Sequence, residues 1–229
     1  MRDVINRLVR KMCVFCGLFE SHTGICAHCE DVLPRNDNFC CRCGQPMDAP
    51  STGASPCGAC IAKQPVFDLA RAPMRYEFPV DVALKKLKFN RKLQFAPPLA
   101  RLLEPVARQS FSGCDVLVPV PLYRWRHARR GFNQADELCK TLAKLTNLPV
   151  LLTTKRRRAT RSQSGLDAAA RLKNVRSAFV VEQPVRFRYP LIVDDVITTG
   201  ATCNELADAL KQAGAPRVGV LAVARSSAL

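Results

Sequence analysis

Apolar runs of strand length alternate with amphipathic stretches over most of the chain after about residue 74. The runs at 74–78, 115–121, 191–193 and 217–224 predict strands, and the apolar spacing at 80–88, 96–108, 135–145 and 200–213 predicts helices. Gly214 follows the last of these helices and Pro216 prevents its continuation. Alternating strands and helices are typical of an α/β domain built on a parallel sheet.

The N-terminal segment has a different pattern. In residues 1–12, Val4, Ile5, Leu8, Val9 and Met12 fall at helical spacing, with basic residues between them, so we expect a short amphipathic helix and no signal peptide. No apolar run approaches the roughly 18 residues that a membrane span needs. We therefore expect a cytoplasmic protein without membrane insertion.

Eight of the twelve cysteines form four Cys-x-x-Cys pairs. In a reducing compartment such pairs indicate metal sites, and in sequence order they predict two tetrahedral structural zinc sites. The predicted ligands are Cys13, Cys16, Cys26 and Cys29, then Cys40, Cys43, Cys57 and Cys60. A single zinc, interleaved pairing or a redox role are the alternatives, with Cys41 as a register alternative and His28 as a remote ligand candidate.

The cysteine pairs and the charge divide the chain in two. We expect an N-terminal helix and zinc-ribbon module at 1–64 and an α/β domain at 65–229. The formal charge is +16, with +1 on residues 1–65 and +15 on residues 66–229. The small module is therefore a poor candidate for a polyanion-binding surface, and the large domain is a better one.

Half of the basic residues in the large domain lie in three clusters, which form either a solvated face or a track for nucleic acid. Phe89, Trp125 and Phe132 lie among them as candidates for base stacking. The clusters are Lys85, Lys86, Lys88, Arg91 and Lys92; Arg124, Arg126, Arg129 and Arg130; and Lys155, Arg156, Arg157, Arg158 and Arg161.

The apolar run at 191–193 leads directly into two carboxylates, Asp194 and Asp195, and then into a Thr/Gly loop where a helix begins. Small hydroxylated residues and glycine at a helix start can surround a phosphate with N–H groups and hydroxyls. The carboxylates lie one ribose away, where they can accept hydrogen bonds from a diol. An ordinary strand–turn–helix with an exposed acidic pair is the alternative.

The segment 191–202 resembles the phosphoribosyl-pyrophosphate (PRPP) signature of type I phosphoribosyltransferases. That resemblance implies that Asp194 and Asp195 hold the ribose hydroxyls and that the 5′-phosphate is held by Thr198, Thr199, Gly200, Ala201 and Thr202. It also implies a pyrophosphate loop at Leu122, Tyr123 and Arg124, a mobile basic loop with Arg156, Arg158 and Gln163, and Mg²⁺ bound with PRPP.

Several further motifs extend this resemblance to nearly the whole chain. Val-Pro-Val-Pro at 118–121, Arg-Arg-Gly-Phe-Asn-Gln at 129–134, Arg-x-Arg-x-Thr-x-x-Gln at 156–163 and the four cysteine pairs are similar to those of the ComF/GntX family. Those proteins combine a double zinc ribbon with a type I phosphoribosyltransferase-like domain and are linked to natural transformation and DNA uptake.

The family resemblance implies a PRPP-binding protein that handles incoming single-stranded DNA, with a DNA-uptake helicase as a candidate partner. It favours a phosphoribosyltransferase-type enzyme whose acceptor the sequence does not identify. The ligand that it implies is PRPP or a related ribose phosphate. Two alternatives stay open: a salvage transferase that makes a nucleotide from a free base, and a catalytically silent binding module.

Overall fold

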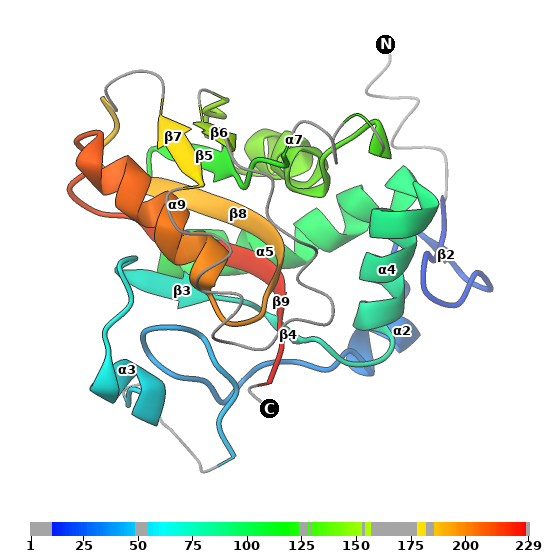
Figure 1. The fold of residues 1–229 in the computed structure, drawn as a ribbon. Helices are drawn as coiled ribbons and strands as arrows, with labels where there is room; N and C mark the ends of the chain where they lie inside the picture. Colours follow the sequence, from blue (N-terminus) through cyan, green and yellow to red (C-terminus); the bar gives the residue numbers. More distant parts are fainter. Residues whose placement is uncertain are drawn as a thin grey trace.

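Figure 1 shows the computed structural model, which describes residues 11–48, 55–123, 128, 130–152, 154–156, 178–181 and 186–227. A five-stranded sheet with only parallel pairings forms its centre, and the strands follow one another in the order β3–β9–β8–β5, with β4 also paired to β9. Their bounds are β3 (Leu69–Arg71), β4 (Met74–Arg75), β5 (Val116–Pro119), β8 (Pro190–Ile197) and β9 (Gly219–Arg225).

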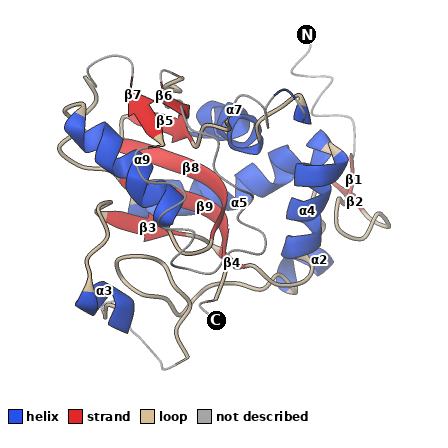
Figure 2. Cartoon of the chain, in the orientation of Figure 1, coloured by secondary structure: helices blue, strands red, loops and turns tan. Residues whose placement is uncertain are grey.

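Helices cover both faces of this sheet (Figures 1 and 2). α5 and α7 pack against each other and against β9 and β8, whereas α9 packs on the opposite face. α4 leads through a short 3-10 turn, η1 (Leu93–Phe95), into α5. The helix bounds are α4 (Val80–Asn90), α5 (Ala96–Ser110), α7 (Gln134–Thr146) and α9 (Ala201–Gln212).

Side-chain alternation along the central strands explains the two layers. In β8, Leu191 and Val193 belong to the core under α5 and α7, while Ile192 between them belongs to the core under α9. β9 alternates in the same way, with Leu221 facing the first layer and Val220 the second. A strand covered on both faces must be apolar at every position, which is why these segments read as continuous apolar runs.

Two small antiparallel ribbons flank the central sheet. β1 (Lys11–Met12) pairs with β2 (Glu20–Ser21) beside the first group of cysteines, and β6 (Thr154–Arg156) pairs with β7 (Phe179–Val181). Two short helices, α2 (Ala27–Asp31) and α3 (Gly58–Ala62), complete the described elements.

The α/β class and the four long helices predicted from the sequence are confirmed. Several strands differ from prediction, and the two short antiparallel ribbons, β1–β2 and β6–β7, were not predicted. The strand expected at 74–78 ends at Arg75, because the N–H of Glu77 donates to the Arg75 carbonyl in a turn that leads to α4, and β3 was not predicted. The helix expected at 1–12 lies almost entirely outside the described residues, and its last two positions form β1.

Candidate functional site

A cleft of about 610 Å³, here called the central cleft, opens at the carboxyl end of β8. Three walls enclose it: α4 with the segment before it, the segment that joins β5 to α7, and the end of β8 with the start of α9. The lining residues used below are Tyr76, Lys85, Lys86, Lys88, Phe89, Leu122, Arg130, Gln134, Arg156, Asp194, Asp195, Thr198, Gly200, Ala201 and Thr202.

Asp194 and Asp195, the acid pair, lie inside β8, two residues before its end. β5 pairs with β8 only as far as Val193, whereas β9 continues alongside β8 to Ile197. The acid pair therefore lies just beyond the last β5 partner, where the sheet edge opens into the central cleft. This step in the sheet places two carboxylates at the carboxyl end of a parallel strand, the region where ligands of open α/β sheets generally bind.

Lys88 of α4 forms an ion pair with the acid pair. Its Nζ donates to Oδ2 of Asp195 at 3.0 Å, and the Asp195 side chain is only 10% exposed. The carboxylate of Asp195 raises the pKa of Lys88. Burial acts to raise the pKa of Asp195, but the ammonium group of Lys88 outweighs it and holds that pKa below its usual value. Asp195 is therefore ionised.

Asp194 behaves in the opposite way. Burial and the neighbouring Asp195 carboxylate raise its pKa well above the usual value, and its Oδ1 accepts a hydrogen bond from the backbone N–H of Asp195 at 2.8 Å. Two carboxylates this close share one counter-ion, so one holds its charge and the other favours a proton. A ligand group that donates hydrogen bonds or carries positive charge would suit this pair of carboxylates.

This electrostatic arrangement predicts that Asp194→Asn raises the melting temperature at pH 7. Asparagine keeps the acceptor oxygen for the Asp195 N–H but removes the repelled charge. Because the folded-state pKa of Asp194 is raised, the wild type is destabilised above the unfolded pKa of about 4 and loses this penalty as the pH falls to that value. The advantage of the variant should therefore shrink between pH 7 and pH 4 in thermal melts. An advantage that is constant with pH would contradict the assignment.

The predicted phosphate loop, 198–202, follows β8 directly. Gly200 caps the N-terminus of α9 with φ of 77°, a left-handed conformation that glycine adopts without strain. Thr199 Oγ1 accepts from the N–H of Ala201 at 3.3 Å, while Thr198, Gly200, Ala201 and Thr202 line the central cleft. Four of the five predicted residues therefore border the same cleft as the acid pair, whereas Thr199 is exposed and does not line it.

The other predicted loops are placed in part. Leu122 and Arg156 line the central cleft, and Arg156 lies with its guanidinium 5.4 Å from the centre of the Phe179 ring. Tyr123 is half-buried and is not among the lining residues. Arg124, Arg158 and Gln163 lie outside the described residues.

Several cleft residues were absent from the predicted site. Lys88 was read only as a member of a basic cluster and Phe89 only as a candidate for base stacking, although they follow one another on α4 and both line the central cleft. Arg130 and Gln134 reach the cleft from the segment before α7 and from its first turn. The available signal was the Lys88–Phe89 dipeptide and the run ending in Gln134, but helical spacing alone did not show that these side chains line the same cleft as the acid pair.

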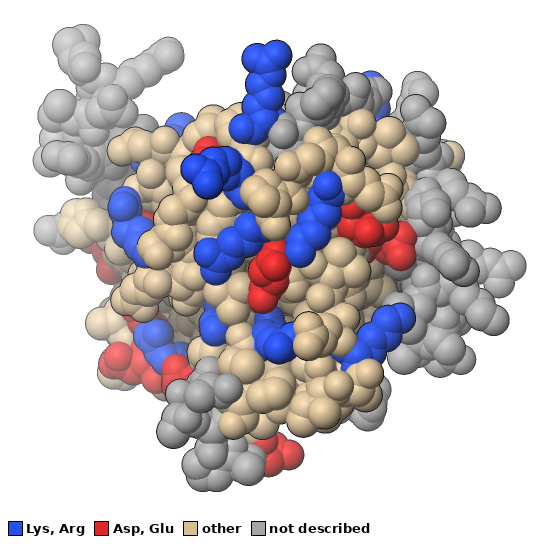
Figure 3. All heavy atoms as spheres, turned by 90° about the vertical axis from the view of Figure 1, so that its left-hand side faces the viewer, with Lys and Arg blue, Asp and Glu red and all other residues tan. Residues whose placement is uncertain are grey.

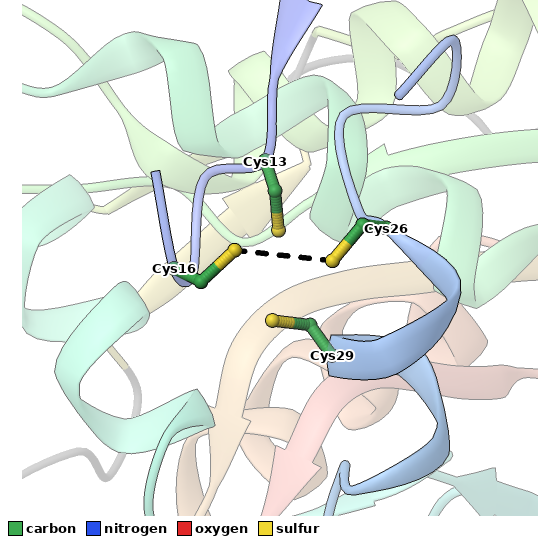
Figure 4. A group of neighbouring side chains, drawn as sticks. All are labelled: Cys13, Cys16, Cys26 and Cys29. Atoms are coloured by element: carbon green, nitrogen blue, oxygen red, sulfur yellow. Dashed lines mark hydrogen bonds between the residues drawn. The ribbon is translucent and has the colours of Figure 1, made fainter. Parts of the chain in front are cut away.

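The eight paired cysteines form two groups, the first cluster at Cys13, Cys16, Cys26 and Cys29 and the second cluster at Cys40, Cys43, Cys57 and Cys60. In each, the four Sγ atoms lie within 4.8 Å of one another, and Figure 4 shows the first four pointing toward a common centre. The sequential pairing is confirmed, and neither Cys41 nor His28 belongs to either group. Each cluster joins a tight turn to a helix start, α2 after Cys26 and α3 after Cys57.

The sulfur geometry fits structural zinc. Tetrahedral coordination with Zn–S bonds of about 2.3 Å places the sulfur atoms about 3.8 Å apart. The Sγ atoms of Cys16 and Cys26 are 3.8 Å apart, and those of Cys43 and Cys57 are 3.7 Å apart. Four thiolates would fill all four positions of a tetrahedral zinc ion in each cluster, which leaves no open position for a substrate of the kind that a catalytic zinc site needs.

The second cluster is connected to the end of β8 through Arg225, which is 4% exposed. Its Nε donates to the Cys43 carbonyl at 3.3 Å, and its Nη1 donates to the Ile197 carbonyl at 2.9 Å. Ile197 directly precedes the phosphate loop. One buried side chain thus joins the metal-binding turn to the loop that borders the central cleft.

The sequence is similar to several curated proteins. It is 39% identical over 212 residues to the DNA utilization protein YhgH of Salmonella typhi. That alignment covers 90% of this chain and 92% of the Salmonella protein. It is 36% identical to the YhgH protein of Escherichia coli K12, with the same coverage, and 32% identical over 225 residues to competence protein F of Haemophilus influenzae, covering 93% and 96%. No protein-family model matches the chain.

Two solved structures match part of this chain. One is a glutamine PRPP amidotransferase from B. subtilis complexed with ADP and GMP, with a TM-score of 0.41, 20% identity and coverage of 60% of this chain and 30% of that chain. The other is a purine phosphoribosyltransferase from Pyrococcus horikoshii Ot3, with a TM-score of 0.29, 17% identity and coverage of 56% and 79%. Within the described residues, no helix combines the length and apolar character that a membrane crossing requires.

Proposed function

Because the chain belongs to the family of the DNA utilization protein YhgH and competence protein F, we propose that it is a PRPP-binding protein that acts in the handling of DNA. The observation that carries the PRPP part is the acid pair at the step of the sheet, next to the phosphate loop in one cleft. An ionised Asp195 and a proton-sharing Asp194 suit a ribose diol, and the start of α9 suits a 5′-phosphate.

The remaining cleft residues support a site for the pyrophosphate group. Arg156 and Lys88 border the cleft, and cations placed there would stabilise the charge that develops on a departing pyrophosphate. Mg²⁺ bound with PRPP would supply further charge stabilisation, and the proposed ligand itself, through its pyrophosphate oxygens, provides the oxygen donors that Mg²⁺ prefers.

Isothermal titration calorimetry with PRPP in the presence of Mg²⁺ tests this proposal. We expect one PRPP per chain, and we expect ribose 5-phosphate to compete for the same site. An absence of measurable binding by both compounds would contradict the proposal. A panel of bases and nucleotides with radiolabelled PRPP, scored for pyrophosphate release, then separates a transferase from a silent binding module.

The DNA part rests on the names of the relatives and on the charge of the large domain. On the face shown in Figure 3, Lys and Arg side chains are interspersed with Asp and Glu instead of forming one continuous patch. The basic residues Lys85, Lys86 and Arg130 instead gather around the central cleft. We therefore place the contact with single-stranded DNA at the rim of the cleft, and a steep decrease of DNA affinity with salt concentration is the expected signature.

A further inference from the structure

We propose that Arg225 is a positioning residue for the phosphate loop, and that through it zinc binding at the second cluster and ligand binding in the central cleft depend on each other. This inference rests on the proposed ribose-phosphate site and deepens it, because it assigns the site a regulating ion. The second cluster then acts on ligand affinity and not only on the stability of the fold.

The guanidinium of Arg225 is buried between two backbone carbonyls that belong to different sites. It donates to Cys43 in the metal-binding turn and to Ile197 at the end of β8. No carboxylate forms an ion pair with it within the part of the chain that the structure describes. Four thiolates around one Zn²⁺ carry a net charge of about −2, so a cation held at the turn of Cys43 favours the zinc-loaded cluster.

The contact with Ile197 lies where the chain leaves the sheet. Ile197 is the last residue of β8 and lines the central cleft, and Thr198 of the phosphate loop follows it. The Ile197 carbonyl accepts two hydrogen bonds, one from Arg225 and one from the backbone N–H of Ser226 at 3.0 Å. The end of β9 and the guanidinium together therefore fix the direction of this carbonyl.

The direction of the Ile197 carbonyl also determines that of a donor in the phosphate loop. The carbonyl of Ile197 and the N–H of Thr198 belong to one trans peptide group, which is planar, so the N–H points away from the guanidinium. A hydrogen bond from a cation to the carbonyl also polarises the peptide and strengthens its N–H as a donor. Arg225 thus both orients and strengthens the first N–H that the loop offers to a phosphate.

Apolar packing joins the same two places by a second route. Three of the four cysteines of the second cluster belong to the core under α9, together with Phe67 and Ile197. A Cβ atom placed at Gly200 would lie 3.8 Å from the ring of Phe67, so this ring supports the turn of the phosphate loop. Zinc that orders the second cluster would therefore also order the surface on which the loop rests.

The first cluster has no comparable connection. None of its four cysteines belongs to the two apolar cores that flank the sheet. Among the hydrogen bonds of the described residues, none leads from these cysteines to β8 or to the phosphate loop. The coupling should therefore involve one of the two zinc ions, and the other ion serves as an internal control.

Coupling between two binding sites is reciprocal. If zinc at the second cluster raises the affinity for a ribose phosphate, the ribose phosphate must raise the affinity for zinc by the same factor. Couplings of this kind typically amount to about 5- to 150-fold. This reciprocity distinguishes a positioning role from a merely structural one, because a residue that only stabilises the fold does not make zinc affinity depend on the ligand.

The test measures zinc affinity by competition with a coloured zinc chelator, with and without saturating ribose 5-phosphate. Mg²⁺ and PRPP are omitted, because a pyrophosphate group would itself bind zinc. One of the two ions of the wild type should bind about fivefold more tightly, or more, when the ligand is present. Cys29→Ser, which should keep zinc at the second cluster alone, identifies the responding ion.

Arg225→Gln should keep both zinc ions but bind ribose 5-phosphate about fivefold more weakly or worse, and its zinc affinity should no longer respond to the ligand. Arg225→Lys keeps the charge but cannot reach both carbonyls, so it should lose the coupling as well. Arg217→Gln is the matched control, since Arg217 precedes the opposite end of β9 and stacks on Tyr189. A lower melting temperature of Arg225→Gln with unaltered coupling would assign Arg225 a structural role and overturn the proposal.

The wild-type measurement decides the coupling even if Arg225→Gln does not fold. Zinc affinity that is the same with and without bound ribose 5-phosphate overturns the inference and leaves the proposed function in place. Failure of the zinc-loaded wild type to bind either ribose 5-phosphate or PRPP removes the proposed function, and the inference with it.

Discussion

Asp195→Asn should lower the affinity for PRPP by about 100-fold or more. The ionised carboxylate would accept hydrogen bonds from the ribose diol, and hydrogen bonds to a charged group contribute about 1.5–3 kcal/mol each. The amide carries no charge, and the 3.0 Å contact with the ammonium group of Lys88, which positions the side chain of residue 195 in the cleft, is no longer an ion pair. Both effects act in the same direction, which makes this the largest expected effect of a single substitution on ligand binding.

Calorimetry with PRPP and Mg²⁺ measures this loss directly. Asp208→Asn is the matched control, because Asp208 is exposed on α9 and its carboxylate contacts only Gln212 of the same helix among the contacts observed. Thermal melts add a second discrimination. Asp195→Asn should lower the melting temperature, since it separates a buried ion pair, whereas Asp194→Asn should raise it. Equal PRPP affinity for the wild type and Asp195→Asn would rule out the role assigned to the acid pair.

Cys60→Ser should release one zinc ion and cause the largest loss of stability. A structural zinc site contributes about 10–16 kcal/mol in small zinc-binding peptides, whereas a whole domain is stable by only about 5–15 kcal/mol. Cys40, Cys43 and Cys60 of the second cluster are all buried, and they belong to the same apolar core as Phe67 and Ile197. Loss of this zinc therefore removes a part of the main core and not only a peripheral loop.

Metal analysis of the purified protein should find two zinc ions per chain in the wild type and one in Cys60→Ser. Cys114→Ser is the matched control, since Cys114 belongs to neither cluster. Cys29→Ser should also release one ion. It should weaken PRPP binding less than Cys60→Ser does, because Arg225 joins the second cluster, and not the first, to the end of β8. Retention of both ions in Cys60→Ser would contradict the four-cysteine assignment.

The sequence indicated the layers of the fold because both faces of the sheet are covered. Continuous apolar runs mark β8 and β9, and the helix spacing marks α4, α5, α7 and α9 correctly. β3 escaped prediction because it has only three residues, and its partner is the last strand of the chain. Such a strand is defined by its partner more than by its own pattern, since strand preference depends strongly on context.

The candidate site was predictable where its residues are adjacent in sequence. The acid pair and the phosphate loop occupy one continuous segment, so one motif revealed them together. Lys88 comes from a helix 107 positions away, and no local spacing shows that its ammonium group reaches Asp195. Gln134 was visible only as the end of a motif, because an unpaired buried donor is a property of the three-dimensional environment.

The position of Arg225 late in the sequence affects the order in which parts of the fold can form during synthesis. The cysteines of the second cluster leave the ribosome early, but the side chain that joins them to the sheet lies at the end of β9, the last strand. Among the strands that the structure describes, β3 likewise pairs with β9 alone. Early zinc binding can therefore order the turns around the metal, but the nascent chain must wait for its final strand before the cleft and the second cluster become one unit.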